Sequence, residues 1–244
     1  MKIAVFSDAH SNIHALEAVL ADIRRQKPDA MVCLGDTVGY ASQPAACVAR
    51  VRELGCPVVL GNHDEAVFSE ADPAESMNHT AVAGIRHSRH QLTEDDLDWL
   101  RALPMDVKTS EAAFTHASLC DDYPWLYVLD HDDAERHFLA QRKRICFCGH
   151  THRPGVWIKE PGEWIAFKRG EGTVALPKTG KVLINAGSVG QPRDGDPRAC
   201  YAMFHVEEKK VEFRRVEYNV EAAVLGILRA KLPRFTAERL VGAV

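Results

Sequence analysis

Side chains that can bind metal ions occur in five short clusters along the chain, each directly after a run of apolar residues. In chain order the clusters are Asp8-Ala9-His10, Gly35-Asp36, Gly61-Asn62-His63-Asp64, His116 and Gly149-His150-Thr151-His152. Imidazole nitrogens and carboxylate oxygens are common ligands of divalent metals. The short apolar runs predict buried strands of a parallel sheet, whose carboxyl ends meet in one crevice. The sequence therefore predicts a site for more than one divalent cation at that edge.

Strands and helices alternate in the part of the chain that carries the first three clusters. We expect strands at 2–7, 30–34 and 57–60, and helices at 12–26 and 44–54. Residues 12–26 show the helical period, and the residues Pro28-Asp29 end that helix. A β-α-β-α-β order predicts a parallel sheet with right-handed crossovers.

The second half of the chain changes from helix-rich to strand-rich. We expect helices at 73–90 and 94–103, the second capped by Thr93, and strands at 112–115 and 145–148 that deliver His116 and His150. Short strands follow at 156–159, 164–167, 182–185, 200–205 and 210–218, and a terminal helix begins at Asn219 and breaks at Pro233. Gly and Pro turns between short strands indicate antiparallel sheet. Two sheets packed face to face, with helices outside, would accommodate both halves.

Composition limits the class of protein. With 244 residues, 46% of them apolar, we expect one large domain spanning residues 1–244. The net charge of -4 gives no general attraction to nucleic acid or to an anionic membrane, so we expect no obligate nucleic-acid partner. The N-terminal apolar stretch is too short for a signal peptide, and no segment has the apolar length of a membrane span.

Cysteine usage indicates a reducing compartment. The seven cysteines are odd in number and lack the spacing of a disulfide framework, so we expect a cytoplasmic location. Cys146 and Cys148 lie two residues apart on a predicted strand and share one face. We expect them to pack in the interior rather than bind a metal.

The order of the five clusters resembles the calcineurin-like metallophosphoesterase superfamily. The pattern of that family is D-x-H, G-D-x-x, G-N-H-[DE], a lone His and G-H-x-H, and all five parts are present between residues 8 and 152. The segment from Asn185 to Asp194 also resembles a signature of the small prokaryotic branch. The resemblance implies an α/β fold, a four-layer α/β/β/α sandwich with two mixed β-sheets.

The resemblance also implies the ligands of two metal ions. Asp36 would bridge the ions, one carboxylate oxygen to each. The remaining ligands would be Asp8, His10 and His152 at the first ion and Asn62, His116 and His150 at the second. Mixed imidazole and carboxylate ligands favour divalent transition metals over magnesium. We expect two ions, with Mn²⁺ as first choice and iron, zinc, nickel or cobalt as alternatives.

Four further residues are predicted to act on the substrate. His63 would face the phosphate and protonate the leaving oxygen, or stabilise the charge that develops there. Asp64 would either orient that imidazole or cap a helix N-terminus. Asn12 and Arg193 are predicted phosphate contacts, and the planar guanidinium of arginine suits phosphate oxygens.

The leading functional hypothesis is hydrolysis of a small phosphate diester, nucleotide or monoester by a metal-bound hydroxide. The alternatives are a non-catalytic scaffold on the same fold, a module that binds a nucleotide through its metals, and a protein Ser/Thr phosphatase. The phosphatase branch carries Asp-Arg-Gly after G-D-x-x, where this chain has Gly39-Tyr40-Ala41. The expected partner is a small phosphorylated substrate or nucleotide, and the sequence leaves the oligomeric state open.

Overall fold

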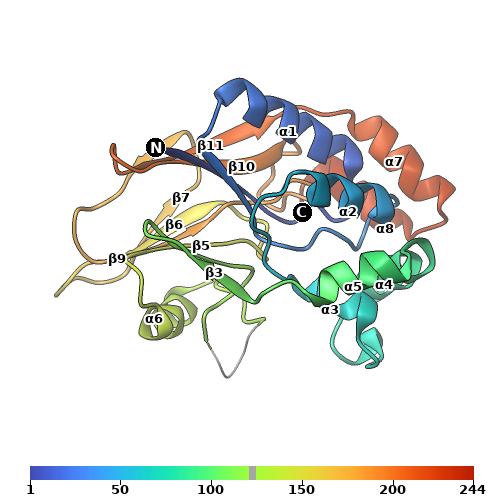
Figure 1. The fold of residues 1–244 in the computed structure, drawn as a ribbon, viewed down its shortest axis with the longest axis horizontal. Helices are drawn as coiled ribbons and strands as arrows, with labels where there is room; N and C mark the ends of the chain where they lie inside the picture. The colour runs from blue at the N-terminus through green and yellow to red at the C-terminus, as the bar shows by residue number, and fades with distance from the viewer. Residues whose placement is uncertain (121–124) are drawn as a thin grey trace.

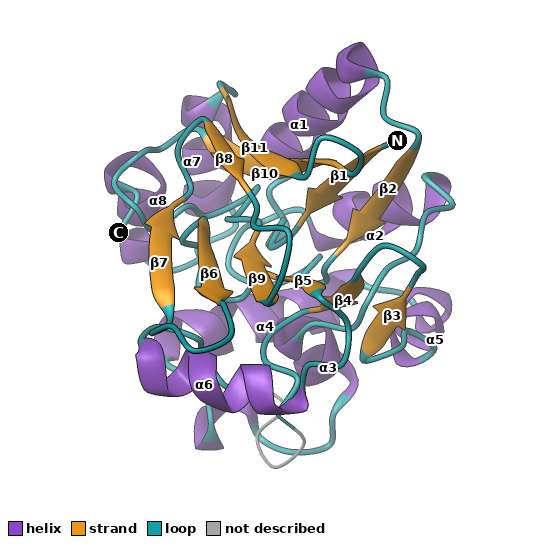
Figure 2. Ribbon diagram, turned by 90° about the vertical axis from the view of Figure 1, so that its left-hand side faces the viewer, coloured by secondary structure: helices purple, strands orange, loops and turns teal. Residues whose placement is uncertain are grey.

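Two β-sheets form the centre of the computed structural model, which describes residues 1–120 and 125–244 (Figures 1 and 2). The first sheet has the strand order β2 (Ala30–Cys33), β1 (Lys2–Phe6), β10 (Ala199–His205), β11 (Lys210–Val216) and β8 (Thr173–Ala175). The second has the order β3 (Asp106–Lys108), β4 (Ala113–Thr115), β5 (Ile145–Cys148), β9 (Lys181–Asn185), β6 (Gly155–Lys159) and β7 (Ala166–Arg169). Both sheets are mixed, because β1 and β5 each have a parallel neighbour while β10 and β6 pair antiparallel. The predicted fold class is confirmed.

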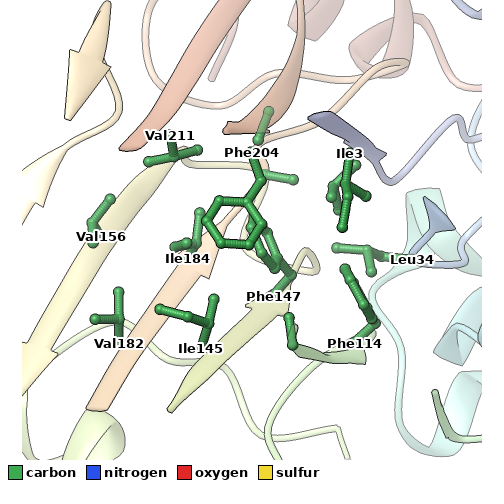
Figure 3. Close-up of a cluster of buried hydrophobic side chains, with 14 of the residues drawn as sticks. Ile3, Leu34, Phe114, Ile145, Phe147, Val156, Val182, Ile184, Phe204 and Val211 are labelled. Atoms are coloured by element: carbon green, nitrogen blue, oxygen red, sulfur yellow. The ribbon is translucent and has the colours of Figure 1, made fainter. Parts of the chain in front are cut away.

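The sheets pack face to face through an apolar core. Ile3 of β1 and Phe204 of β10 face Phe114 and Phe147 of the second sheet (Figure 3). The Phe147 ring lies 5.5 Å, between centroids, from the rings of both Phe114 and Phe204. Complete burial of one such side chain stabilises the fold by about 1.5–3 kcal/mol. This core fixes the two sheets, and therefore their strand ends, against each other.

Helices cover the outer faces of both sheets. Helices α1 (Ile13–Gln26), α7 (Val220–Arg229) and α8 (Arg234–Gly242) lie on the side of the first sheet, and α6 (His131–Ala140) lies on the second (Figure 1). Phe138 of α6 packs on Cys146 and Cys148, which are buried as predicted. The described residues contain no helix long and apolar enough to cross a membrane.

A third group of helices packs together beyond the ends of the strands. It comprises α2 (Pro44–Glu53), α3 (Asn62–Phe68), the 3₁₀ turn η1 (Pro73–Glu75), α4 (His79–Gln91) and α5 (Glu94–Arg101). Thr93 caps α5 as predicted, since its side chain accepts a hydrogen bond from the amide of Asp96.

Two predicted elements are wrong. Residues 57–60 form only an isolated bridge between Val58 and Cys33, because the amide of Leu60 donates to the Pro104 carbonyl instead of continuing a ladder. The helix predicted at 73–90 is divided into η1 and α4, since Asn78 caps a new helix start. The sequence analysis also did not predict α3, α6, β3 and β8.

Candidate metal centre

Four strand ends, two from each sheet, bring the predicted ligands together. Asp8 follows β1, Asp36 follows β2, His116 follows β4 and His150 follows β5. The loops are tied to one another by backbone hydrogen bonds, such as the one from Gly149 N to the carbonyl oxygen of His116 at 2.8 Å. Ligands that lie far apart in the sequence therefore meet at one edge of the sandwich.

Backbone strain is concentrated at these ligands. Positive φ angles occur at Asp8 (57°), His10 (47°), Asp36 (51°), His150 (67°) and His152 (59°). A left-handed conformation costs a residue other than glycine about 1–2 kcal/mol. Strain of this kind persists where surrounding structure enforces it, and it clusters at functional sites.

The first ligand group consists of Asp8, His10 and His152. The Nε2 atoms of the two imidazoles lie 3.0 Å apart, and Asp8 Oδ1 lies 3.3 Å from His152 Nε2 and 3.7 Å from His10 Nε2. All three side chains are buried. Ligand atoms that converge so closely in the interior fit one divalent ion.

The second group consists of Asn62, His116 and His150, with Asp36. His116 Nε2 lies 3.2 Å from Asn62 Oδ1 and 3.2 Å from His150 Nδ1. Asp36, His116 and His150 also have ligand atoms within 4.8 Å of one another. The structure thus brings together all the residues predicted for a second ion.

Asp36 lies between the two groups. Its Oδ2 atom is 3.5 Å from His10 Nε2 and 3.4 Å from His116 Nε2. Its Oδ1 atom accepts a hydrogen bond from the backbone amide of His63 at 2.8 Å. Oδ2 is therefore the carboxylate oxygen that approaches the imidazoles of both groups, while the amide holds Oδ1.

Each ligand imidazole is oriented by a backbone carbonyl. The pairs are His10 Nδ1 with Val38 O (3.0 Å), His116 Nδ1 with Leu34 O (2.7 Å), His152 Nδ1 with Gln191 O (2.6 Å) and His150 Nε2 with Trp125 O (3.1 Å). A neutral imidazole that donates from one ring nitrogen keeps a lone pair on the other. The outer contacts thus direct the bare nitrogens toward the centre, with His150 turned the opposite way from the other three.

The electrostatics of the site favour cations. Burial would raise the pKa of Asp36, but His116 and His63 outweigh it and hold that pKa well below its usual range. Burial lowers the pKa of His150 to about 3. Burial also opposes protonation of His116, but Asp36 outweighs it and raises the pKa of His116 to about 9. The carboxylates are charged and His150 is neutral, and a bound cation would displace the extra proton of His116, so these side chains form a donor set suited to divalent metal ions.

The segment from Asn185 to Asp194 braces both ligand loops. Asn185 Nδ2 donates to the carbonyl of Gly149 at 2.5 Å, and Ser188 Oγ donates to the carbonyl of Asp8 at 2.9 Å. Gln191 supplies the carbonyl that orients His152. The segment from Asn185 to Asp194 therefore holds the loops that carry the metal ligands in place.

Comparison with known proteins agrees with this geometry. The family described as the calcineurin-like phosphoesterase superfamily domain matches residues 1–209. The chain belongs to this superfamily. Uncharacterized protein MJ0912 of Methanocaldococcus jannaschii is 36% identical over 243 residues, which cover 98% of this chain and 96% of that protein.

Solved structures show the same fold over the full length. A metallophosphoesterase from Sphaerobacter thermophilus is 34% identical, with a TM-score of 0.86 and complete coverage of both chains. Hypothetical protein PH1004 from Pyrococcus horikoshii OT3 has a TM-score of 0.79 at 18% identity. The match covers 98% of this chain and 97% of the PH1004 chain. The second likeness is one of fold alone.

His63 lies beside the ligand groups, in contact with His10 and Tyr40. Its ring is buried, lies 4.7 Å from the rings of His10 and Tyr40, and has no hydrogen-bond partner for Nδ1 among the described residues. Burial lowers the pKa of His63 to about 4, against the attraction of Asp36. The imidazole is therefore neutral in the free protein, and a bound phosphate anion would favour its protonation.

Gly39 lies directly against the His63 imidazole. A Cβ atom on Gly39 would lie 2.3 Å from His63 Nδ1, and the φ angle of +97° disfavours any side chain. We expect Gly39→Ala to displace the ring and to lower kcat about a hundredfold, a loss that misplacement by 1 Å can cause. Steady-state kinetics on metal-loaded protein would measure this loss.

Gly55→Ala is the matched control for Gly39→Ala. Gly55 also has a positive φ, +59°, but an added Cβ meets nothing within 4 Å. Both variants share the backbone cost of about 1–2 kcal/mol, and only one disturbs His63. Equal activities of the two variants would contradict the packing of Gly39 against the imidazole.

Asp64 caps α3 instead of orienting His63. Its Oδ1 accepts from Val38 N at 3.2 Å and its Oδ2 accepts from Gly61 N at 3.3 Å. No hydrogen bond joins it to the His63 ring within residues 1–120 and 125–244. Both oxygens are occupied by backbone amides, so the capping alternative replaces the predicted catalytic role.

Asn12 also has a structural position. It is buried, its Oδ1 accepts from Ala15 N at 3.2 Å, and its Nδ2 donates to the Gly190 carbonyl at 3.0 Å. Since Oδ1 caps the start of α1 and Nδ2 holds the Gly190 loop, both ends of the amide are occupied, and the predicted phosphate contact is not supported.

Arg193 lies at the mouth of the site. Its Nη2 donates to Gln191 Oε1 at 2.9 Å, and its guanidinium carbon lies 5.6 Å from the centroid of the Tyr40 ring. Because Tyr40 in turn packs against His63, the guanidinium is near the position expected for phosphate. A phosphate contact for Arg193 stays a prediction.

Residues that the sequence analysis missed form a cavity beside His63. This α3 cavity of about 330 Å³ is lined by Asn62, His63 and His150 together with Trp125 and Tyr127, among others. The Tyr127 ring stacks on His150, with 3.8 Å between centroids. No motif marks Trp125 and Tyr127, and an aromatic pair after the lone His116 is the one signal that would have drawn attention to them. The cavity is large enough for a small-molecule group.

Proposed function

We propose that this protein is a metal-dependent phosphoric ester hydrolase that holds two divalent transition-metal ions. The position of Asp36 Oδ2, 3.5 Å from His10 Nε2 and 3.4 Å from His116 Nε2, carries this proposal. One carboxylate oxygen between two sets of imidazoles suits a pair of ions and not a single one. Manganese is our first choice, because the ligands mix nitrogen and oxygen.

Each ligand group would hold one of the two ions. When bound, such ions supply Lewis acidity toward a phosphoryl oxygen and make a water nucleophilic near neutral pH. Asp8, His10 and His152 would hold one ion and Asn62, His116 and His150 the other, and the backbone carbonyls keep the imidazoles in the tautomers that such binding needs.

His63 and the α3 cavity define where the leaving group departs. His63 lines that cavity, so a group placed there would have its ester oxygen beside the ring. The imidazole would give a proton to that oxygen or stabilise its charge. Arg193, whose guanidinium carbon lies 5.6 Å from the centroid of the Tyr40 ring, would contact a non-bridging phosphate oxygen.

Two non-enzymatic readings, a scaffold and a nucleotide-binding module, use the same fold. Every predicted ligand and His63 are present and converge, which favours an enzyme over a scaffold. The absence of turnover with retained metal binding would support the binding module.

The substrate class is tested by a panel on metal-reconstituted protein. It comprises p-nitrophenyl phosphate, bis(p-nitrophenyl) phosphate, cyclic nucleotides, diadenosine tetraphosphate and a phosphoserine peptide. Gly39-Tyr40-Ala41 lacks the arginine of the phosphatase branch, and a diester carries less charge per phosphorus than a monoester. We expect kcat/KM for the diester or the tetraphosphate to equal or exceed that for the monoester. A phosphopeptide as best substrate would establish the protein phosphatase reading instead.

The setting proposed for this enzyme is the cytoplasm. All seven cysteines are free, which is consistent with a reducing compartment. We also propose that residues 1–244 form one domain, because β1 pairs with β10 and both sheets contain strands from both halves of the chain. The expected partner is a small phosphorylated molecule or nucleotide.

A further inference from the structure

A second cavity, of about 330 Å³, lies on the other side of the loop that carries His150 and His152. This β7 cavity is lined in part by Thr151, Arg153, Trp157, Phe167, Arg169 and Arg193. Thr151 stands between the two ligand histidines, so the cavity adjoins the metal centre. Among the residues that line this cavity, Arg193 is the one to which the proposed function gives a role in substrate binding.

Three arginines give the β7 cavity a positive lining. Arg153 and Arg169 are exposed, Arg193 is half-buried, and no carboxylate lies within ion-pair distance of any of the three in residues 1–120 and 125–244. Two carboxylates also line the cavity: Asp194 is paired with Arg215, and Glu171 is exposed, so the three arginines still exceed the acidic residues. Arg153 Nε donates to the Arg193 carbonyl, and Arg193 Nε and Nη2 donate to Gln191 Oε1. The remaining N–H donors of the three guanidinium groups, and their uncompensated charge, are available to an anion.

Arg193 connects this cavity to the metal centre. It lines the β7 cavity and also lies over Tyr40, which packs against His63. Arg193 therefore places positive charge between the metal centre and the β7 cavity.

An apolar floor accompanies the arginines. Trp157 is buried and Phe167 is half-exposed, and their ring centroids lie 4.5 Å apart. An aromatic surface beside guanidinium groups suits a phosphorylated aromatic molecule such as a nucleotide.

The two cavities differ in charge. The α3 cavity is lined by Glu65 and Asp72 and by no lysine or arginine of the described chain. The longer phosphate chain of a substrate would therefore be disfavoured there and attracted by Arg153 and Arg169, and the α3 cavity would take the leaving group with fewer phosphates. A substrate with several phosphates would accordingly have one orientation in the site.

We propose that the β7 cavity is an anion subsite for a phosphate group beyond the one that reacts, and that the substrates therefore carry two or more phosphates. This inference rests on the proposed hydrolase function. The bond to the leaving group breaks beside His63, water supplies the new oxygen, and the leaving oxygen departs with a proton. The part that is retained stays attached to phosphorus and extends past Arg193 toward Arg169. Unsymmetrical cleavage of diadenosine tetraphosphate fits this scheme: adenosine monophosphate leaves beside His63, and the three other phosphates remain on the side of the β7 cavity.

The kinetic test uses the metal-loaded full chain and two substrates, diadenosine tetraphosphate and bis(p-nitrophenyl) phosphate. The measured quantity is the ratio of kcat/KM for the first substrate to that for the second. Removing a hydrogen bond to a charged group lowers binding or kcat/KM by about 10- to 100-fold. We expect Arg169→Ala and Arg153→Ala each to lower the ratio by that factor. Arg142→Ala removes an exposed arginine outside this cavity and should change the ratio less than about twofold.

A binding test separates this inference from the proposed function. Metal-free protein is titrated calorimetrically with diadenosine tetraphosphate, so that no turnover is needed. Wild-type protein should bind it at least about tenfold more tightly than Arg169→Ala does. If no substrate is hydrolysed but this difference appears, the hydrolase proposal fails and the subsite stands. If both arginine variants bind and turn over the tetraphosphate as wild type does, or if Arg142→Ala has the same effect, the subsite is overturned.

Discussion

Replacing Asp36 by asparagine is expected to remove bound metal and turnover together. Asp36 Oδ2 faces both ligand groups, and Oδ1 accepts the His63 amide at 2.8 Å. An asparagine has one acceptor oxygen for these two tasks, and it lacks the negative charge that offsets two cations. If its oxygen faces the ions, its NH₂ group meets the amide of His63. If it turns over, the NH₂ group faces the ions.

The expected loss in kcat for Asp36→Asn is at least about a thousandfold. Metal ions contribute several kcal/mol of stabilisation to the transition state, and about 4 kcal/mol corresponds to that factor. Metal content is measured by elemental analysis on the protein used for kinetics. Asp98→Asn is the control, because Asp98 is exposed and its one ion pair within the described part of the chain is a surface pair with Arg101. Normal metal content in Asp36→Asn would contradict the position assigned to this carboxylate.

Replacing His63 by alanine is expected to lower kcat while both metals remain bound. None of the predicted ligand atoms is removed, and Nδ1 of this ring has no partner among the described residues. General acid catalysis contributes about 10²–10⁴-fold. The loss should therefore fall in that range, with metal content unchanged by elemental analysis.

The leaving group distinguishes the two roles proposed for His63. Nitrophenolate needs little protonation, whereas an alkoxide needs a proton as the bond breaks. We expect His63→Ala to impair an alkyl ester more than a nitrophenyl ester. An equal loss for both would remove the general-acid role and leave charge stabilisation. His79→Ala, at an exposed histidine that begins α4, is the control and should retain full turnover.

The metal ligands could be predicted because most of them directly follow a strand, and the apolar residues of that strand are visible in the local sequence. The apolar run before Asp8 and the one before His150 form β1 and β5, and local pattern was enough to place both. The two sheets meet through side chains that alternate along the strands, so residues such as Ile3 and Phe147 face the core between them.

The partners of the ligands could not be predicted in the same way. Trp125 and Gln191 orient His150 and His152 through their backbone carbonyls. Every residue has such a carbonyl, so the amino-acid type does not reveal this role. Asp64 had two locally sensible roles, and only the positions of the Val38 and Gly61 amides decided between them. The cavities depend on loops from distant parts of the chain, which short-range pattern does not place.

Anomalous diffraction from crystals of manganese-reconstituted protein tests the two-metal centre most directly. Two peaks of comparable height are expected, one among Asp8, His10 and His152 and the other among Asn62, His116 and His150. Asp36 Oδ2 should lie between them, at the separation of about 3.5–4 Å that paired metal sites show. A single peak in catalytically active crystals, or peaks that Asp36 does not contact, would contradict the account.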